Sequence, residues 1–378
     1  MARSATATAR SPLTRASSLL SGSTGALLIL LLLVAVFSLL APAFLSVNNV
    51  MNITRQYSVL LILAVGQTFV ITTRGIDLSV AATAALSGSI MGVVYAHWGA
   101  STFVAIALGL LAGAIVGVIN GLAVTKLHVP DIIVTLGTMT AVRGVALLVT
   151  GGQPVPYFAD AIDGRRMPDL IATLGAGRIA GVPLILGVAV ACVAIGWFLL
   201  NKTVFGRSVT AVGGNAEAAR VSGIKVDNVK LRVYVLSGLF SAVGGMMLAG
   251  RLQSANANMG ELMELDAIAS VVIGGTNLFG GEGTVIGTFI GVFIIGALGN
   301  GLNMLDISPF WQRVVTGLVI IAVVALDQAR RRLNRAERTV EVASDDDGDD
   351  PGGGGDDDPG GPPPTSPPSG ARAGTGEP

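Results

Sequence analysis

Apolar residues fill most of the chain in long stretches, and polar residues gather in the short segments between them. A helix needs roughly 20 apolar residues to cross a bilayer. Ten stretches reach or approach that length: 25–45, 57–73, 78–98, 101–124, 131–150, 180–200, 233–251, 265–279, 283–304 and 311–327. The pattern predicts an all-α integral membrane protein with about ten transmembrane helices. The stretch 265–279 is short and rich in glycine, so a broken or re-entrant helix is an alternative there.

The first stretch shares some features with a cleaved signal peptide, because Arg3, Arg10 and Arg15 precede it and Ala41-Pro42-Ala43 follows. Its apolar run is roughly 20 residues long, whereas the core of a signal peptide has about 7–15. We therefore expect a retained first helix, preceded by a cytoplasmic N-terminal segment over residues 1–24.

The charged loops predict how the helices are oriented, because cytoplasmic loops of membrane proteins carry an excess of Lys and Arg. With a cytoplasmic N-terminus, ten spans also place the C-terminus and the loop 201–232 in the cytoplasm. That loop has six basic residues and two acidic ones: Lys202, Arg207, Arg220, Lys225, Lys230 and Arg232 against Glu217 and Asp227. The long segment of about 150–180 then lies outside.

Two parts of the chain share a glycine pattern. Glycine recurs at every fourth position at 109, 113, 117 and 121, and again at 283, 287 and 291. Each stretch ends in the triplet Asn-Gly-Leu, at Asn120 and Asn300. This spacing puts the glycines on one helix face, where another backbone can approach closely. The two stretches are the fourth and the ninth of the ten, so they are an odd number of spans apart and cross the membrane in opposite directions. The halves of about 57–150 and 233–327 are therefore predicted to be inverted repeats, an architecture of many transporters.

The composition supports a membrane protein and excludes a soluble one. Only 13% of the residues are charged and the mean hydropathy is +0.70, whereas soluble domains have about 25% charged residues. Residues 339–378 hold ten of the 24 acids and one of the 24 bases, which leaves 23 bases and 14 acids before them. We expect this acidic Gly- and Pro-rich tail to be disordered. We attribute the basic body to membrane topology, with no nucleic-acid partner.

The sequence lacks the motifs that membrane enzymes use. The four lysines do not follow a glycine, so the phosphate-binding loop G-x-x-x-x-G-K-[ST] is missing. His97 and His128 form no H-E-x-x-H zinc motif. We expect no catalytic residue, no metal and no cofactor in this chain. Ionisable residues are scarce within the apolar stretches, which disfavours a proton-driven carrier, and we expect Cys192 to be a packing residue.

The predicted cytoplasmic loop contains one candidate docking element. Residues 215–221 favour a short helix, and the flanking glycines Gly214 and Gly223 can end it. A short amphipathic helix on the cytoplasmic face is a docking element for a partner protein. A surface helix without a partner is the alternative.

The same loop resembles a known family. Glu217-Ala218-Ala219-x-x-x-Gly223 matches the E-A-A-x-x-x-G loop of the permease subunits of ABC importers. The segments Gly75-Ile76-Asp77-Leu78-Ser79-Val80 and Glu264-Leu265-Asp266-Ala267-Ile268-Ala269 resemble the ribose/xylose-type branch. The resemblance covers about residues 25–330, the expected permease domain. The chain departs from the family pattern in two places: a proline is missing after Leu236, and Arg74 stands where a small or polar residue is more usual.

The resemblance implies a transport subunit, not an enzyme, of an ATP-driven importer for a sugar, such as a pentose or another monosaccharide. It implies a location in the bacterial cytoplasmic membrane. The implied partners are a second permease copy in a homodimer or a paralogue, ATPase subunits that hold ATP and Mg, and an extracytoplasmic sugar-binding protein. Glu217, Ala218, Ala219 and Gly223 would couple the permease to the ATPase. The alternatives are an ABC permease for branched-chain amino acids or nucleosides, and a stand-alone secondary transporter.

Three further sets of residues are candidates for a role in transport. An uncharged sugar needs uncharged polar partners, which predicts a pathway along Asn120, Asn300, Asn303 and Thr276, with hydrogen bonding between helices as the alternative. Asp77 and Asp266 are predicted to pin helix starts, where the helix dipole favours an acid, rather than to contact substrate. Arginine pairs well with carboxylates, so the candidates for docking the binding protein are Arg165, Arg166, Arg178, Arg251 and Arg313. Ordinary solvated arginines are the alternative.

Overall fold

The computed structural model describes residues 22–156 and 162–318, together with residues 321 and 325. These residues belong to one unit, Met1–Gln328. The predictions for the segment before residue 22, for the tail 339–378 and for most of the last apolar stretch beyond residue 318 lie outside the described residues.

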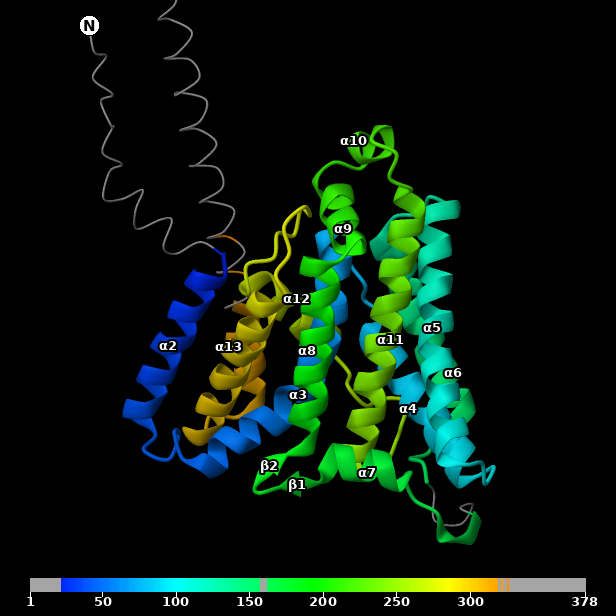
Figure 1. Cartoon of the computed structure of the whole chain (residues 1–378). Helices are drawn as coiled ribbons and strands as arrows, with labels where there is room; N and C mark the ends of the chain where they lie inside the picture. Colours follow the sequence, from blue (N-terminus) through cyan, green and yellow to red (C-terminus); the bar gives the residue numbers. More distant parts are fainter. Residues whose placement is uncertain (1–21, 157–161, 319–320, 322–324, 326–378) are drawn as a thin grey trace, which may run out of the picture. The chain divides into compact units, whose positions relative to one another are not determined.

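Helices occupy the predicted apolar stretches (Figure 1). Their bounds are α2 Gly22–Leu40, α3 Val47–Thr72, α4 Val80–Ala96, α5 Thr102–Lys126, α6 Asp131–Thr150, α8 Leu184–Lys202, α11 Val226–Leu252, α12 Met263–Ile273 and α13 Val285–Met304. A further helix occupies residues 309–318. Seven helices of the described chain are long and apolar enough to cross a membrane: α2, α3, α5, α6, α8, α11 and α13. The chain is therefore a mostly helical, multi-pass membrane protein.

Two of the predicted stretches form shorter helices. α4 has 17 residues and α12 has 11. α12 ends just before Gly274 and Gly275, and Gly275 has a φ of +94°, which glycine adopts far more readily than other residues. The stretch 265–279 is thus a short helix followed by a glycine turn. This agrees with the alternative prediction of a broken helix.

Hydroxyl side chains determine where several helices begin. Ser46, Ser101 and Thr284 stand just before α3, α5 and α13, and each accepts a hydrogen bond from an N–H of the first turn. At the end of α6, Gly151 adopts a φ of +59° and stops the helix. These residues satisfy main-chain groups that have no partner inside the helix.

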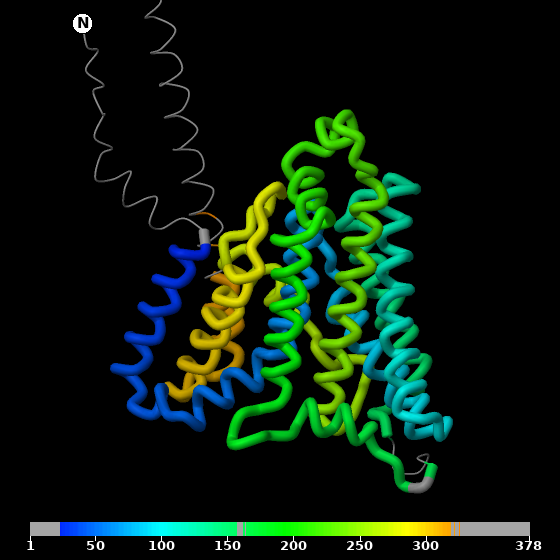
Figure 2. The backbone as a smooth tube through the Cα atoms, in the orientation of Figure 1, coloured from blue at the N-terminus to red at the C-terminus, as the bar shows by residue number. Residues whose placement is uncertain are grey.

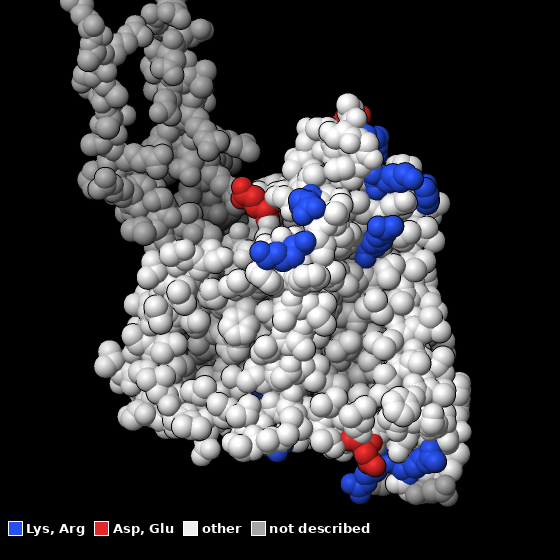
Figure 3. Space-filling view, viewed as in Figure 1, with Lys and Arg blue, Asp and Glu red and all other residues white. Residues whose placement is uncertain are grey.

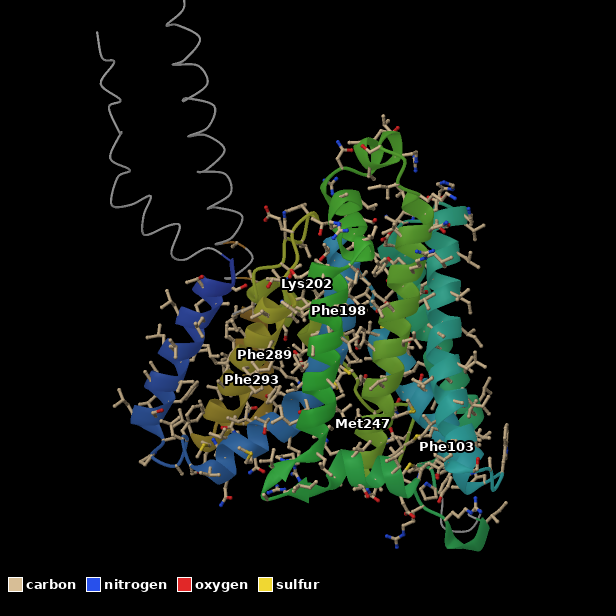
Figure 4. All side chains as sticks on the ribbon, in the orientation of Figure 1. Phe103, Phe198, Lys202, Met247, Phe289 and Phe293 are labelled. Carbon is tan, nitrogen blue, oxygen red and sulfur yellow. The ribbon has the colours of Figure 1, made fainter. Side chains whose placement is uncertain are left out.

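α3 and α11 form the centre of the bundle (Figures 1 and 2). Every residue of α3 from Ser58 to Thr72 is buried, and α11 contacts α3, α4 and α5. α5 and α6 lie on one side of this centre, and α2 and α13 lie on the other. The outer helices present apolar side chains outward, among them Phe103 of α5, which is 79% exposed, and Phe198 of α8 (Figure 4). Such a surface suits the hydrocarbon of a bilayer.

The first glycine series lets two backbones touch. Gly113 and Gly117 of α5 lie against the main-chain carbonyls of Gly238 and Tyr234 on α11. A side chain at either glycine would overlap these carbonyls. The prediction that this face admits a neighbouring backbone is confirmed, and the neighbour is α11.

The second glycine series, on α13, also permits close contact between two backbones. Gly287 and Gly291 of α13 lie against the main-chain carbonyls of Gly274 and Ser270, at the end of α12. The missing Cβ atoms are again what permits the contact. Both series therefore pack helix on helix, each against a different partner.

Two short helices lie at one end of the bundle, at the top of Figure 1. α9 (Val204–Gly214) follows α8, and α10 (Ala216–Val221) follows α9 after one residue. Both belong to the loop 201–232, which the sequence predicted to be cytoplasmic.

The opposite end of the bundle holds the segment that was predicted to be outside. It contains a short 3-10 turn, α7 (Asp169–Ala176) and two strands, β1 (Arg178–Ile179) and β2 (Val182–Pro183), which pair antiparallel. Ala180 and Gly181 form the turn between them, both with positive φ, as tight two-residue hairpins require. Helices still make up most of the described chain, as the all-α prediction requires, and this hairpin is a short addition to them.

Charged side chains gather at the two ends of the described bundle (Figure 3). Lys and Arg surround the end that carries α9 and α10, and a smaller mixed group lies at the other end. The band between them is almost free of charge in this view. An uncharged band between two charged rims is the surface that a membrane-spanning protein presents.

Gly113→Ala is expected to destabilise the protein, because the added methyl group would overlap the Gly238 carbonyl and the Ala242 side chain. Overpacking of this kind costs about 1–3 kcal/mol. Gly144→Ala on α6 is the matched control, since nothing lies within 4 Å of its added methyl group. Thermal unfolding of the two purified variants in detergent measures the difference. Equal midpoints would contradict the close packing of α5 on α11.

Candidate functional site

α10 is a short helix held at the basic end of the molecule (Figure 1). The Asn215 side chain caps it by accepting hydrogen bonds from the N–H groups of Glu217 and Ala218, both at 3.0 Å. Ala219 is buried, whereas Glu217 and Ala218 are exposed and Val221 is 83% exposed. One side of α10 therefore anchors the helix, and the other is open to solvent.

Gly223 ends this helix. Its φ is +84°, and its N–H donates to the Arg220 carbonyl at 3.0 Å. The next N–H, of Ile224, returns to the Ala219 carbonyl at 3.0 Å. Glycine suits this position because a side chain disfavours the left-handed conformation. The segment Glu217–Gly223 is thus a short helical turn with a cap at one end and a glycine stop at the other.

An open cleft lies beside α10, next to the ends of α5 and α11. Polar and basic side chains predominate in its lining: Lys126, Arg220, Gly223, Ile224, Lys225, Val226, Asp227 and Asn228. The Lys126 ammonium and the Asp227 carboxylate lie 3.8 Å apart. The cleft and the exposed side of α10 together form a surface that can receive a complementary partner.

Arg74 joins the end of α9 to the end of α3. Its Nε donates to the Gly213 carbonyl at 2.6 Å, and its terminal nitrogen donates to the Gly214 carbonyl. These carbonyls belong to the last turn of α9, where a cation is favoured by the helix dipole. In the sequence, Arg74 stood out as a departure from the family pattern. In the structure, its two bonds fix the end of α9 to the end of α3.

A glycine turn holds the same helix end from another side. The Gly281 N–H donates to the Thr72 carbonyl at 3.0 Å, and Gly213 lies against that carbonyl. Gly280 and Gly281 have φ of +78° and +83°. The motif Gly280-Gly281-x-Gly283 therefore places a loop between α12 and α13 directly against the end of α9.

Asp77 is the centre of a buried polar network. It is only 3% exposed. One carboxylate oxygen accepts from the Ser79 N–H at 2.9 Å and from the Ser79 hydroxyl at 2.6 Å, and the other accepts from the Ser237 hydroxyl of α11 at 2.9 Å. The Gln67 amide, oriented so that its oxygen faces the Asp77 N–H, pairs with both main-chain groups of Asp77 at 3.2 Å. Asp77 thus ties the start of α4 to α3 and α11.

Asn120 extends this network to α5. Its amide donates to the Ser79 hydroxyl at 2.9 Å, and the side chain is 1% exposed. Several nearby polar groups on the same helices are buried without a partner among the described residues: the Asn120 side-chain oxygen and the hydroxyls of Thr83, Ser87, Ser89 and Ser241. The amide nitrogen of Asn120 thus makes a hydrogen bond to the start of another helix, which is the alternative to a role in the substrate pathway.

A second polar cluster, which the sequence did not indicate, holds the start of α11. The Tyr234 hydroxyl donates to the Asp131 carboxylate at 2.8 Å, and the Lys230 ammonium lies 3.9 Å from it. Gly75 packs against both polar atoms of the pair, with Asp131 Oδ2 2.6 Å and the Tyr234 hydroxyl 2.8 Å from where a Cβ would stand. Thr135, one turn into α6, donates its hydroxyl to the Ile76 carbonyl at 3.0 Å.

The other candidate pathway residues lie elsewhere. Asn300 of α13 exchanges two hydrogen bonds with Asn49 of α3, at 2.8 and 3.0 Å. Thr276 is buried, and its hydroxyl accepts from the Thr284 N–H at 3.2 Å. Asn303 is exposed. Asn120 and Asn300 therefore bond to different helices, and their role in substrate passage stays a prediction.

The acidic residues of α12 differ in their surroundings. Asp266 lies half-buried in the first turn, as expected of an acid at a helix start. Glu264 is 6% exposed, and its Oε2 has no hydrogen-bond partner among the described residues. Arg143 of α6 donates to the Ala257 carbonyl at 2.6 Å. Hydropathy alone did not single out this arginine in an apolar stretch.

The five candidate docking arginines fall into two groups. Arg165 donates to the Gly99 and Ala100 carbonyls at 2.8 and 3.0 Å, and Arg251 donates to the Gln56 carbonyl at 2.9 Å. Both side chains hold parts of this chain together. The side chains of the second group are exposed: Arg166, Arg178 and Arg313. The second group is available to a partner.

The described chain is thus a multi-pass helical bundle with an exposed, capped helix at its basic end. The family model for the permease component of branched-chain amino acid transport systems matches residues 49–324. The chain belongs to this family of permeases.

The chain is similar over most of its length to permeases of known name. It is 46% identical over 306 residues to the ribose import permease protein RbsC of Bacillus subtilis, which covers 81% of this chain and 92% of that protein. It is 43% identical over 299 residues to RbsC of Haemophilus influenzae, covering 79% and 90%. It is 39% identical over 320 residues to the galactose/methyl galactoside import permease protein MglC of Escherichia coli, covering 81% and 94%. No solved structure matches the chain.

Asp77→Ala is expected to destabilise the protein, because the hydroxyls of Ser79 and Ser237 lose their acceptor. Each donor left without a partner costs about 1–3 kcal/mol. Asp77→Asn is the control, since it keeps the shape and one acceptor oxygen, and its loss should be smaller. Thermal unfolding in detergent compares the three proteins. If alanine and asparagine behave alike, the carboxylate does not hold α4 to α11.

Proposed function

We propose that this chain is the permease subunit of an ATP-driven importer that carries a monosaccharide, such as a pentose, across the bacterial cytoplasmic membrane. The observation that carries the proposal is the capped, solvent-facing α10 with its Glu217-Ala218-Ala219-x-x-x-Gly223 sequence at the basic end of a multi-pass bundle. The names of the similar permeases, for ribose and for galactose, support a sugar as the substrate.

The membrane arrangement of the proposal has ten spans in two inverted repeats, with both termini and α10 in the cytoplasm. In this proposal the ten spans would be the seven long helices together with α4, α12 and the helix that begins at residue 309. The basic residues around α9 and α10 support the orientation. The matching glycine series of α5 and α13, each used to contact another backbone, support the repeat.

The same proposal divides the chain into three parts. Residues 1–24 form a cytoplasmic N-terminal segment, residues 25–330 form the permease domain, and residues 339–378 form a disordered acidic tail. Within the permease domain, the loop 201–232 couples the repeat halves 57–150 and 233–327 to the energy source.

Transport requires proteins that this chain does not supply. A partner ATPase would hold ATP and Mg, and α10 would rest in a cleft of that ATPase through Glu217, Ala218, Ala219 and Gly223. A rigid helix transmits a displacement better than a flexible loop, so movement of the ATPase would rock the helical halves and expose the pathway to each side in turn. A second permease, identical or a paralogue, would complete the pathway.

The substrate class follows from the relatives and from the polar residues. The similar proteins are named for sugars, which favours a sugar over branched-chain amino acids or nucleosides. An uncharged pathway through Asn120, Asn300, Asn303 and Thr276 would suit hydroxyl groups. A stand-alone secondary transporter needs no docking helix, so α10 disfavours that alternative.

Gly223→Val is expected to lower the amount of ATPase subunit that co-purifies with the permease, because valine strains the left-handed turn that ends α10. We expect a loss of at least about tenfold, equivalent to about 1.4 kcal/mol. Gly181→Val is the matched control, since Gly181 has a φ of +86° and open space around it, like Gly223 at +84°, but lies in the hairpin at the opposite end. Equal co-purification of the two variants would refute the docking role.

Arg178→Glu is expected to weaken the docking of the sugar-binding protein, because its exposed guanidinium would lose attraction for carboxylates and gain repulsion. The concentration of binding protein that half-saturates uptake should rise by roughly tenfold at low salt and less at high salt. Arg178→Lys keeps the charge and serves as the control. A response of both variants that does not depend on salt would contradict an electrostatic contact.

A further inference from the structure

Six consecutive residues, Thr72–Asp77, contact the chain both before and after α10. We name them the linking segment. It joins the end of α3 to the start of α4. Its contacts reach both flanks of the loop that carries α10, and they also reach the buried network of the bundle.

The first flank of the loop is the end of α9. Arg74 donates to the Gly213 and Gly214 carbonyls, and Gly213 lies so close to the Thr72 carbonyl that a side chain there would overlap it. Only Asn215 separates α9 from α10. One residue of connecting chain therefore separates α10 from the helix that the linking segment contacts.

The second flank is the start of α11. Gly75 packs against the pair formed by the Tyr234 hydroxyl and the Asp131 carboxylate, which are 2.8 Å apart. The linking segment thus contacts the chain both before and after α10, and the two contacts come from adjacent residues, Arg74 and Gly75.

The inner end of the linking segment is Asp77. Its carboxylate accepts from Ser79 at the start of α4 and from Ser237 of α11. On the other side of the segment, Thr72 accepts from Gly281 in the turn between α12 and α13. The segment therefore contacts parts of both proposed repeats.

The backbone of Arg74 shows that this position is held by its contacts. Its φ is +67°, in the left-handed region that residues with a side chain rarely adopt. Strain of this kind persists where the surroundings fix the conformation. Glycine would relax the backbone here but would remove both bonds to α9.

We propose that the linking segment transmits the displacement of α10 to the membrane helices, and that Arg74 is the positioning residue that fixes α9 to it. This inference rests on the proposed coupling of α10 to an ATPase. It adds that the coupling passes through Arg74 and the Thr72–Gly213 contact, not only through the covalent chain.

The test measures how many sugar molecules are imported per ATP hydrolysed, in vesicles that contain the permease, its ATPase and binding protein, with ribose as the probe. Arg74→Gly removes the bonds and keeps the backbone geometry. Gly213→Ala pushes α9 away from Thr72. Gly187→Ala is the control, because it makes the same change on the neighbouring helix α8 with nothing within 4 Å of the added methyl group.

Arg74→Gly and Gly213→Ala are each expected to lower the ratio by about fivefold or more, the range of an ordinary coupling energy, while the ATPase still co-purifies and hydrolyses ATP. Gly187→Ala should keep the ratio of the unaltered protein. Arg74→Lys, which keeps the charge and can reach one carbonyl, should give an intermediate ratio, and it serves as the mild variant if the two stronger changes prevent assembly.

An unchanged ratio in the assembled variants would overturn the role of the linking segment. A different result tests the proposed function itself: if the unaltered permease neither binds the ATPase nor imports ribose with ATP, the coupling proposal fails before any variant is compared. The two failures are therefore distinguishable.

Discussion

The fold depends on one constraint: polar groups inside a membrane protein must find their partners within the protein, because hydrocarbon offers none. Asp77 meets this constraint with donors from two helices, Ser79 at the start of α4 and Ser237 on α11. The requirement fixes where α3 ends, where α4 begins and how α11 lies across both. The position of α10 follows, since the linking segment that ends in Asp77 also holds the helix α9 from which α10 extends.

Glycine supplies the second condition. Buried hydrogen bonds such as that from Ser237 to Asp77 join helices that pack closely, and Gly113 and Gly117 permit such close packing between α5 and α11. Lipid tails are as apolar as leucine, so close packing and hydrogen bonds, rather than the hydrophobic effect, hold such helices together. The same use of Gly287 and Gly291 against the end of α12 gives a second rigid pair. Closely packed helix pairs of this kind can move as units, as the proposed rocking of the helical halves requires.

Much of this could be predicted from the sequence, and the limits have physical reasons. Hydropathy located the helices but began α3 ten residues late, because its first turns carry polar residues such as Asn49, whose amide pairs with Asn300. The glycine spacing predicted a close contact without naming α11, since spacing describes one helix and not its neighbour. Arg74 could not be explained from the sequence, because its acceptors are main-chain carbonyls about 140 residues away that any residue type could provide.

The most direct test of the account uses sealed vesicles that contain the purified permease, with labelled ribose outside. Ribose is predicted to accumulate against its gradient only when the ATPase subunit, the binding protein and ATP are all supplied, because we propose that this chain is a gate driven through α10. Accumulation by the permease alone, without nucleotide or companion subunit, would contradict it.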